Sequence, residues 1–119
     1  MSEWVRSGPI DERFQGVAPA ASFTIGTVNV AEDEAWEIVS ASSINLTANR
    51  GYLYLYYYYG GVKMGTAYAW NMDSGQPGSF WNPVCFPGEY EIRAILSGVS
   101  AGDEIRVVLT GWRWKEKVE

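Results

Sequence analysis

The sequence contains no histidine, and Cys85 is the only cysteine among its 119 residues. Without histidine, the chain lacks the commonest general base and the commonest metal ligand of proteins. One cysteine can form neither a disulfide within a monomer nor a zinc site, which argues against a disulfide-stapled secreted scaffold. A chain of this length buries about two thirds of its unfolded surface on folding, so a single domain needs no such support. We expect Cys85 to be a small buried side chain.

Long apolar runs and basic clusters are also missing. No stretch approaches the roughly 18 consecutive apolar residues of a membrane-spanning helix, and the first six residues lack the features of a signal peptide. The net charge is −5, and no basic stripe offsets it. A polyanion would be repelled on average, so we expect neither nucleic-acid nor membrane binding. Folding in a reducing cytoplasm is the simpler expectation.

Few residues are candidates for catalysis. Serine nucleophiles need an activating base, and no histidine is present to supply one. Glu89 and Glu91 lie two residues apart, which places their carboxylates within reach of each other on one strand face. Charges on an exposed strand face are, however, the ordinary way to keep it solvated and to discourage edge pairing. We therefore expect no enzymatic activity.

Acidic residues in two places could in principle hold calcium, whose ligands are oxygens. One group is the turn of Glu32, Asp33 and Glu34, and the other is Asp73 with Asp103, if their loops converge. A solvated turn explains the three adjacent acids equally well. We expect no bound metal and no cofactor.

The hydrophobic pattern from residue 23 onward has a period of two, which is typical of β-strands. Turn signals recur every 8 to 12 residues, including the hairpin signal Gly60-Gly61. These features predict an all-β, antiparallel, jelly-roll-like sandwich of seven to eight strands. The expected strands are residues 23–30, 36–46, 52–59, 62–70, 80–86, 89–96 and 104–114.

Side-chain alternation also predicts which strand faces point to the core. In the last two strands the core face holds Tyr90, Ile92, Ala94, Leu96, Ile105, Val107 and Leu109. In the strand that begins at residue 36, it holds Trp36, Ile38, Ser40, Ser42, Ile44 and Leu46. A bulge at Gly111 is expected to turn Trp112 toward the core.

Residues 1–21 are rich in glycine and proline and are predicted to form an extended N-terminal arm, with the sandwich domain spanning residues 22–119. Residues 11–15 could form one helical turn that carries Ile10 and Phe14 on one side. Such a turn is too short to be stable alone. We therefore expect Ile10 and Phe14 to contact a partner.

The most informative segment is the tyrosine-rich strand of residues 52–59. Leucine is buried more readily than tyrosine, so Leu53 and Leu55 should face the core. The opposite face then presents Tyr52, Tyr54, Tyr56 and Tyr58, and we expect Tyr68 and Trp70 of the next strand to extend it. Even half exposed, four such rings make a patch of roughly 300–500 Å², as large as any on a typical monomer.

Three explanations for this patch remain open at the level of the sequence. The chain's own arm or a loop could cover it, another subunit could dock on it, or sugar rings could stack on it. Tyrosine suits all three, because each hydroxyl can stay hydrogen-bonded while the ring is buried.

The segments 35–42 (AWEIVSAS), 86–93 (FPGEYEIR) and 100–111 (SAGDEIRVVLTG) give residues 23–114 a resemblance to a known family. In strand order and in its Pro-Gly and Ala-Gly-Asp turns, this region resembles the small jelly-roll-like structural proteins of tailed phages, such as capsid decoration and fibre-type subunits. No functional residue carries over, because such subunits have no catalytic residues to match.

The resemblance implies a non-enzymatic virion component, most simply a capsid decoration (cement) or similar accessory protein. Its partners would be further copies of itself, in a homo-oligomer such as a trimer, and the major capsid or tail subunits. It would be made in the host cytoplasm and end in the virion, and it would bind through its aromatic face and N-terminal arm. The alternative is a carbohydrate-binding β-sandwich module with a Tyr/Trp platform for a glycan.

Overall fold

The computed structural model describes residues 3–72, 78–79 and 83–117, and these residues form two antiparallel β-sheets. The all-β sandwich predicted from the sequence is confirmed, with nine strands in the described part of the chain. Sheet A contains β1 (Glu3–Val17), β9 (Glu104–Lys117), β3 (Glu34–Asn45) and β6 (Gly78–Ser79), with β7 (Val84–Phe86) also paired to β3. Sheet B contains β2 (Ser22–Asn29), β8 (Tyr90–Ser97), β4 (Tyr52–Tyr59) and β5 (Val62–Asn71).

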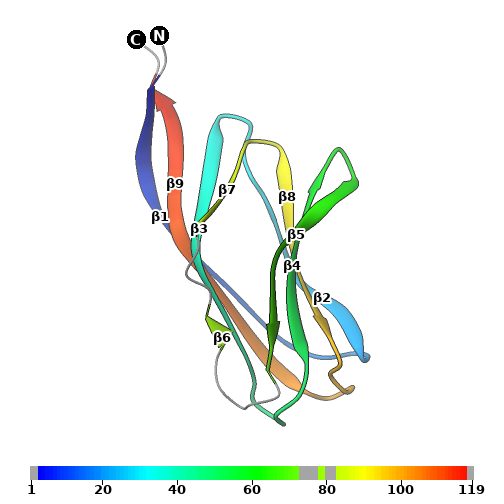
Figure 1. Ribbon diagram of the computed structural model, residues 1–119. Coiled ribbons are helices and arrows are strands. Elements are labelled where there is room, and N and C mark those ends of the chain that lie inside the picture. Colours follow the sequence, from blue (N-terminus) through cyan, green and yellow to red (C-terminus); the bar gives the residue numbers. More distant parts are fainter. Residues whose placement is uncertain (1–2, 73–77, 80–82, 118–119) are drawn as a thin grey trace.

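The strand pairs are nested within one another along the chain. The hairpin β4–β5 is innermost, β3 with β6 and β7 encloses it, β2–β8 encloses these, and β1–β9 is outermost. Successive pairs alternate between the two sheets, which is the arrangement of a jelly roll. Figure 1 shows the result, with β1 and β9 side by side at one side of the molecule and the β4–β5 hairpin at the other.

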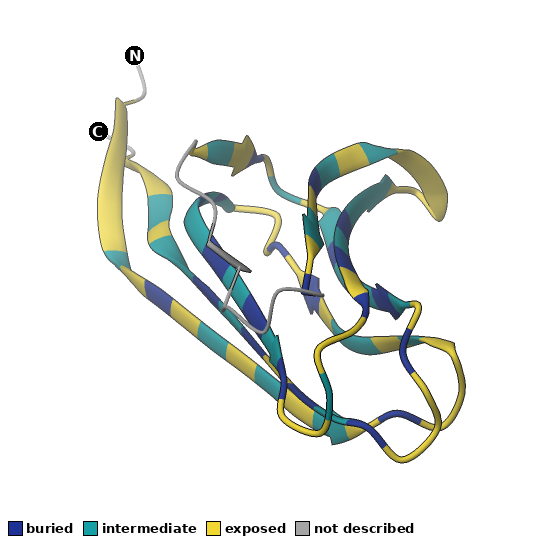
Figure 2. Cartoon of the chain, turned by 60° about the horizontal axis from the view of Figure 1, so that its bottom comes forward, coloured by how far each residue is buried: buried dark blue, intermediate teal, exposed yellow. Residues whose placement is uncertain are grey.

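The core lies between the sheets and follows the predicted alternation in β8 and β9. Ile92, Ala94 and Leu96 are buried, and so are Ile105, Val107 and Leu109. Leu53 and Leu55 of β4 join them, as expected for the leucine face. Buried and exposed positions alternate along most strands (Figure 2), so each sheet has one inner and one outer face.

In β3 the predicted core face is correct only for its first half. Trp36 and Ile38 are buried, but from there the buried residues are Ala41, Ser43 and Asn45, not Ser40, Ser42, Ile44 and Leu46. The register against β9 shifts between Ile38 and Ser40, so Val39 is an extra residue. A bulge of one residue moves every later side chain to the opposite face.

The bulge expected at Gly111 therefore lies on the partner strand, and Trp112 does not turn toward the core. Gly111 pairs with Ile38, and the carbonyl oxygen of Glu37 occupies the place where a side chain of residue 111 would begin. The glycine thus permits a close backbone approach instead of a bulge. With the alternation of β9 unbroken, Trp112 points outward and is 37% exposed.

The N-terminal segment is extended, as expected, but residues 3–17 form a full strand of sheet A. β1 pairs with β9 from Glu3 opposite Lys117 to Val17 opposite Glu104. The helical turn predicted for residues 11–15 is wrong, since these residues are paired with β9. The boundary drawn between residues 21 and 22 therefore assigns β1 to a different unit from β9, the strand of sheet A to which it is hydrogen-bonded. Pro9 is tolerated because β1 is an edge strand, where a missing N–H costs little.

Two turns that were predicted at glycines lie within the described residues, and both are present. Gly60 and Gly61 connect β4 to β5 with φ of 59° and 80°, which confirms the predicted hairpin. The turn predicted over residues 47–51 is also present, and Gly51 has φ of 113°. The loop predicted for residues 71–78 lies mostly outside the described residues, as do residues 80–82. The short strand β7 lies at the β6 side of sheet A, as the proline before it suggested.

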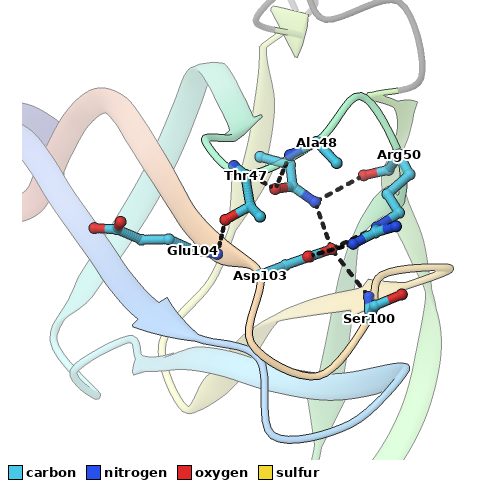
Figure 3. A network of polar contacts seen from close by, with 7 residues as sticks. Thr47, Ala48, Arg50, Ser100, Asp103 and Glu104 are labelled. Atoms are coloured by element: carbon cyan, nitrogen blue, oxygen red, sulfur yellow. Dashed lines mark hydrogen bonds and ion pairs between the residues drawn. The ribbon is translucent and has the colours of Figure 1, made fainter.

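A buried carboxylate joins the loops at one end of the sandwich (Figure 3). Asp103 is 1% exposed, and its oxygens accept hydrogen bonds from Arg50 Nη2 at 2.6 Å and Arg50 Nε at 2.8 Å. Asn45 Nδ2 donates to it at 2.9 Å and the Ser100 amide at 3.0 Å. These donors, the arginine first, hold the pKa of Asp103 well below its ordinary value despite its burial.

Candidate binding surface

The four tyrosines predicted to face outward form a continuous row on the outer face of sheet B, here called the tyrosine face (Tyr52, Tyr54, Tyr56 and Tyr58). Leu53 and Leu55 are 0% and 1% exposed, which fixes the opposite direction for the tyrosines. Ring centroids are 6.4 Å apart for Tyr52 and Tyr54, and 5.6 Å apart for Tyr54 and Tyr56. The interplanar angles are 25° and 19°, so these three rings support one another as a stack.

Cations of the same chain lie over the two tyrosines nearest the hairpin tip. Lys63 Nζ stands 3.4 Å from the ring centroid of Tyr56, and the guanidinium carbon of Arg93 stands 3.9 Å from that of Tyr58. Arg93 is held in place by an ion pair with Glu91 at 2.8 Å. Cation–π contacts of this kind occupy a ring face that a ligand would otherwise use.

The other half of the tyrosine face carries no such cation in the described residues. Tyr52 is 38% exposed, and the cross-strand neighbours of Tyr54 are Ile95 on β8 and Ala69 on β5. β1 belongs to sheet A, so the N-terminal segment does not cover this surface. Tyr52, Tyr54, Ile95 and Ala69 therefore form an apolar area on an outer face, where antiparallel sandwiches are usually polar.

Tyr68 and Trp70, expected to extend the tyrosine face, lie on the other face of sheet B. Tyr68 pairs with Leu55 and Trp70 with Leu53, and directly opposed residues share a face. Tyr68 is 7% exposed and stacks on Trp70, with ring centroids 6.4 Å apart. Burial raises the pKa of Tyr68 to about 12. Both rings therefore belong to the core side, and the tyrosine face is confined to β4.

Ile10 and Phe14, expected to contact a partner, pack within this chain. Ile10 is 2% exposed and belongs to the core cluster that contains Trp36 and Phe86. Phe14 is half-buried, and its ring lies so close to Gly26 of β2 that a side chain there would collide with it. Both residues join β1 to the sandwich instead of projecting from it.

Cys85 is exposed, contrary to the buried position expected from its apolar neighbours. It lies on β7 opposite Glu37 of β3, and both side chains point to the outer face of sheet A. Partial burial raises the pKa of the Cys85 thiol, and the negative charge of Glu37 raises it further. A raised pKa keeps the thiol protonated at neutral pH and lowers its reactivity.

The acidic residues considered for chemistry do not converge in the described part of the chain. Glu89 occupies a turn with φ of 71°, while Glu91 is paired with Arg93. Glu34 accepts a hydrogen bond from Trp36 Nε1 at 3.4 Å, and Asp103 is saturated by its own donors. No group of three potential metal ligands is found among the described residues, and Asp73 lies outside them.

A second aromatic cluster lies on the outer face of sheet A, and it includes Trp112, which was expected to turn toward the core. It consists of Arg6, Trp112 and Trp114, here called the tryptophan surface. The guanidinium carbon of Arg6 lies 4.5 Å from the ring centroid of Trp112 and 5.2 Å from that of Trp114. Trp114 Nε1 donates to Glu37 Oε1 at 3.2 Å. The alternation of Trp112 and Trp114 in the sequence could have revealed this pair, had no bulge been expected at Gly111.

None of the described segments forms a helix capable of crossing a membrane. Comparison with protein-family models and with curated proteins finds no match to this sequence. Among solved structures, the chain is similar to a subunit of Bacillus endospore appendages, which are described as disulfide-linked pili. The similarity has a TM-score of 0.55 at 16% identity and covers 97% of this chain and 90% of that one.

A weaker similarity relates the chain to a protein in the structure of infectious bursal disease virus, Gt strain. It has a TM-score of 0.41 at 12% identity and covers 98% of this chain but only 32% of the viral chain. The endospore appendage subunit, by contrast, shares this fold over 90% of its own length. At these identities the comparisons concern the fold alone.

Proposed function

We propose that this chain is a non-enzymatic structural subunit that docks on neighbouring subunits through the tyrosine face. The observation that carries the proposal is the half of that face over which no cation lies among the described residues, where Tyr52 and Tyr54 stack beside Ile95 and Ala69 on an outer surface. Tyrosine is enriched in protein interfaces because a large rigid ring is buried at low entropic cost. A fold shared with an appendage subunit supports the proposal.

The finer proposal is that the assembly is a phage particle, with this chain as a capsid decoration or similar accessory protein bound to capsid or tail subunits. It depends on the resemblance of residues 23–114 to such proteins. Mass spectrometry of purified particles from the strain that encodes the sequence tests it. Detection at a fixed ratio to the major capsid protein supports the assignment, and absence from intact particles contradicts it.

Carbohydrate binding is less well supported by this geometry. Stacking on sugars requires open ring faces, and cations of the chain itself already cover Tyr56 and Tyr58. Two stacked rings remain. The cross-strand neighbours of Tyr54 are aliphatic, and only those of Tyr52, which are Asn71 and Ser97, are polar. Tryptophan and tyrosine fluorescence titrated with a polysaccharide panel decides the question, and saturable binding that depends on Tyr52 and Tyr54 would replace docking as the function.

Replacing Tyr52 and Tyr54 together by threonine should abolish self-association or weaken it at least about 30-fold, because central aromatic residues dominate interface energies. Threonine retains the strand propensity of the positions. Sedimentation velocity over a range of micromolar concentrations measures the effect. The control is Val62→Thr, which alters a more exposed apolar position at the hairpin tip and should change nothing. A double variant that assembles like the wild type, or a wild type that stays monomeric throughout, contradicts docking between copies through this face.

Cys85 should contribute little to assembly. A single thiol can link two chains but cannot propagate a covalent polymer, so the described disulfide linkage of the endospore pili has no equivalent built from this chain alone. Because the pKa of the thiol is raised, we expect it to react with a disulfide reagent more slowly at pH 7 than in the same chain unfolded in guanidinium. Thiol-reaction kinetics measure the ratio, and Cys85→Ser should leave assembly unchanged. Loss of assembly in Cys85→Ser would contradict this expectation.

A further inference from the structure

We propose that the tryptophan surface is a second docking site, and that it receives the tyrosine face of another copy of this chain. The inference rests on the proposed function for the tyrosine face and adds its partner. Copies would then join front to back, each one using two different surfaces.

The first argument is the chemistry of the outer face of sheet A. Trp112 is 37% exposed, at a position on a solvated strand face where a polar residue is usual. Trp114 is held by its hydrogen bond to Glu37. Arg6 covers a face of both indoles, so it would offer its guanidinium to a partner in place of those ring faces. Rings that are already ordered lose little entropy on binding, and tryptophan and arginine with tyrosine are the residues that dominate interface energies.

The second argument is the placement of the two surfaces. The strands that carry the two surfaces, β4 and β9, belong to the two different sheets of the sandwich (Figure 1). The tyrosine face is on the outside of sheet B and the tryptophan surface is on the outside of sheet A, so they point away from each other. A subunit with one self-complementary patch stops at a dimer, whereas two different patches on opposite sides produce rings or filaments. Neither surface can reach the other within one chain, so each requires a separate copy.

The third argument concerns charge. Lys63 and the Arg93–Glu91 ion pair lie at the tyrosine face, so two such faces in contact would bring like charges together. At the tryptophan surface the carboxylate of Glu37 balances the guanidinium of Arg6, and Arg6 can donate to tyrosine hydroxyls. Contact between the two unlike surfaces therefore avoids the repulsion that two tyrosine faces would have.

Mixing two defective variants tests the proposal. Tyr52→Thr/Tyr54→Thr removes the tyrosine face, and Trp112→Thr removes the exposed part of the tryptophan surface. Each variant alone should associate at least about 30-fold more weakly than the wild type. A one-to-one mixture contains one intact pair of complementary surfaces, so it should form a discrete heterodimer with the affinity of a wild-type contact. Sedimentation velocity and native mass spectrometry count the chains.

The alternatives give different results. If tyrosine faces bind each other, the Trp112→Thr variant alone forms a dimer and the mixture forms no heterodimer, which overturns the proposal while leaving the proposed function intact. If Tyr52→Thr/Tyr54→Thr assembles as well as the wild type, the proposed function fails as well. Arg6→Gln provides a second variant of the tryptophan surface, and it should give the same complementation if Trp112→Thr disturbs folding, which circular dichroism checks.

Discussion

Replacing Gly111 by alanine should destabilise the sandwich by more than about 3 kcal/mol, because the added methyl group would collide with the carbonyl oxygen of Glu37. The collision is with backbone, so no side-chain rotation relieves it. The strands β3 and β9 would have to separate at the bulge, where Ile38 pairs with Gly111, and the core beneath them would open. Chemical denaturation monitored by tryptophan fluorescence measures the free energy of unfolding.

The control for this variant is Gly8→Ala in the neighbouring strand β1. Gly8 has no atom of the described structure within 4 Å of an added Cβ, and its φ is not in the left-handed region. The reduced freedom of the unfolded chain should leave stability unchanged or raise it by about 0.4–1 kcal/mol. Equal effects of the two substitutions would mean that the close approach of Glu37 to Gly111 does not exist in solution.

Replacing Asp103 by asparagine should cost about 3 kcal/mol of stability at neutral pH. The substitution keeps the shape but removes the charge, and it turns an amide donor toward Arg50, which is itself a donor. The bonds from Asn45 and Ser100 would weaken at the same time, loosening the turns at that end of the sandwich. Asp11→Asn is the matched control: Asp11 pairs with Arg13 on the surface, and its loss should change stability by less than about 0.5 kcal/mol.

The stabilities of the wild type and of Asp103→Asn should also respond differently to acid. The pKa of Asp103 is lowered in the folded state, so the unfolded chain binds the proton more readily and stability falls as the pH drops below about 3.8, the ordinary value. The stabilising contribution is fully present above that value and is lost as the pH approaches the folded-state pKa. The stability gap between the wild type and Asp103→Asn should therefore be constant near neutrality and shrink below pH 3.8. A gap that persists unchanged in acid would show that the charge is not responsible.

Sequence patterns predicted the elements of this fold well wherever local chemistry is decisive. Alternation assigned the inner faces of β8 and β9, and the two glycines at residues 60 and 61 predicted the central hairpin. The contrast between leucine and tyrosine in β4 gave the direction of the tyrosine face, since burial of an aliphatic side chain is favoured over that of a phenol.

Four errors share one cause, which is that strand pairing is not local. The extra residue Val39 reverses the faces of β3, and nothing near it in the sequence announces this. Tyr68 and Trp70 moved to the core side because their faces are set by the residues opposite them in β4. Trp112 points outward because Glu37 approaches Gly111, and Ile10 is buried because β1 pairs with β9, about a hundred residues later in the chain.

The sequence by itself determined that this is an all-β protein, and that it carries a row of tyrosines on the strand face opposite two leucines. Side chains on a strand alternate with a fixed period, so a local pattern is enough to establish both. Only the tertiary structure decided that Lys63 and Arg93 cover half of that row, and that a second aromatic cluster lies on the opposite sheet. These contacts join residues from different strands, and their geometry depends on register, which no single stretch of sequence contains.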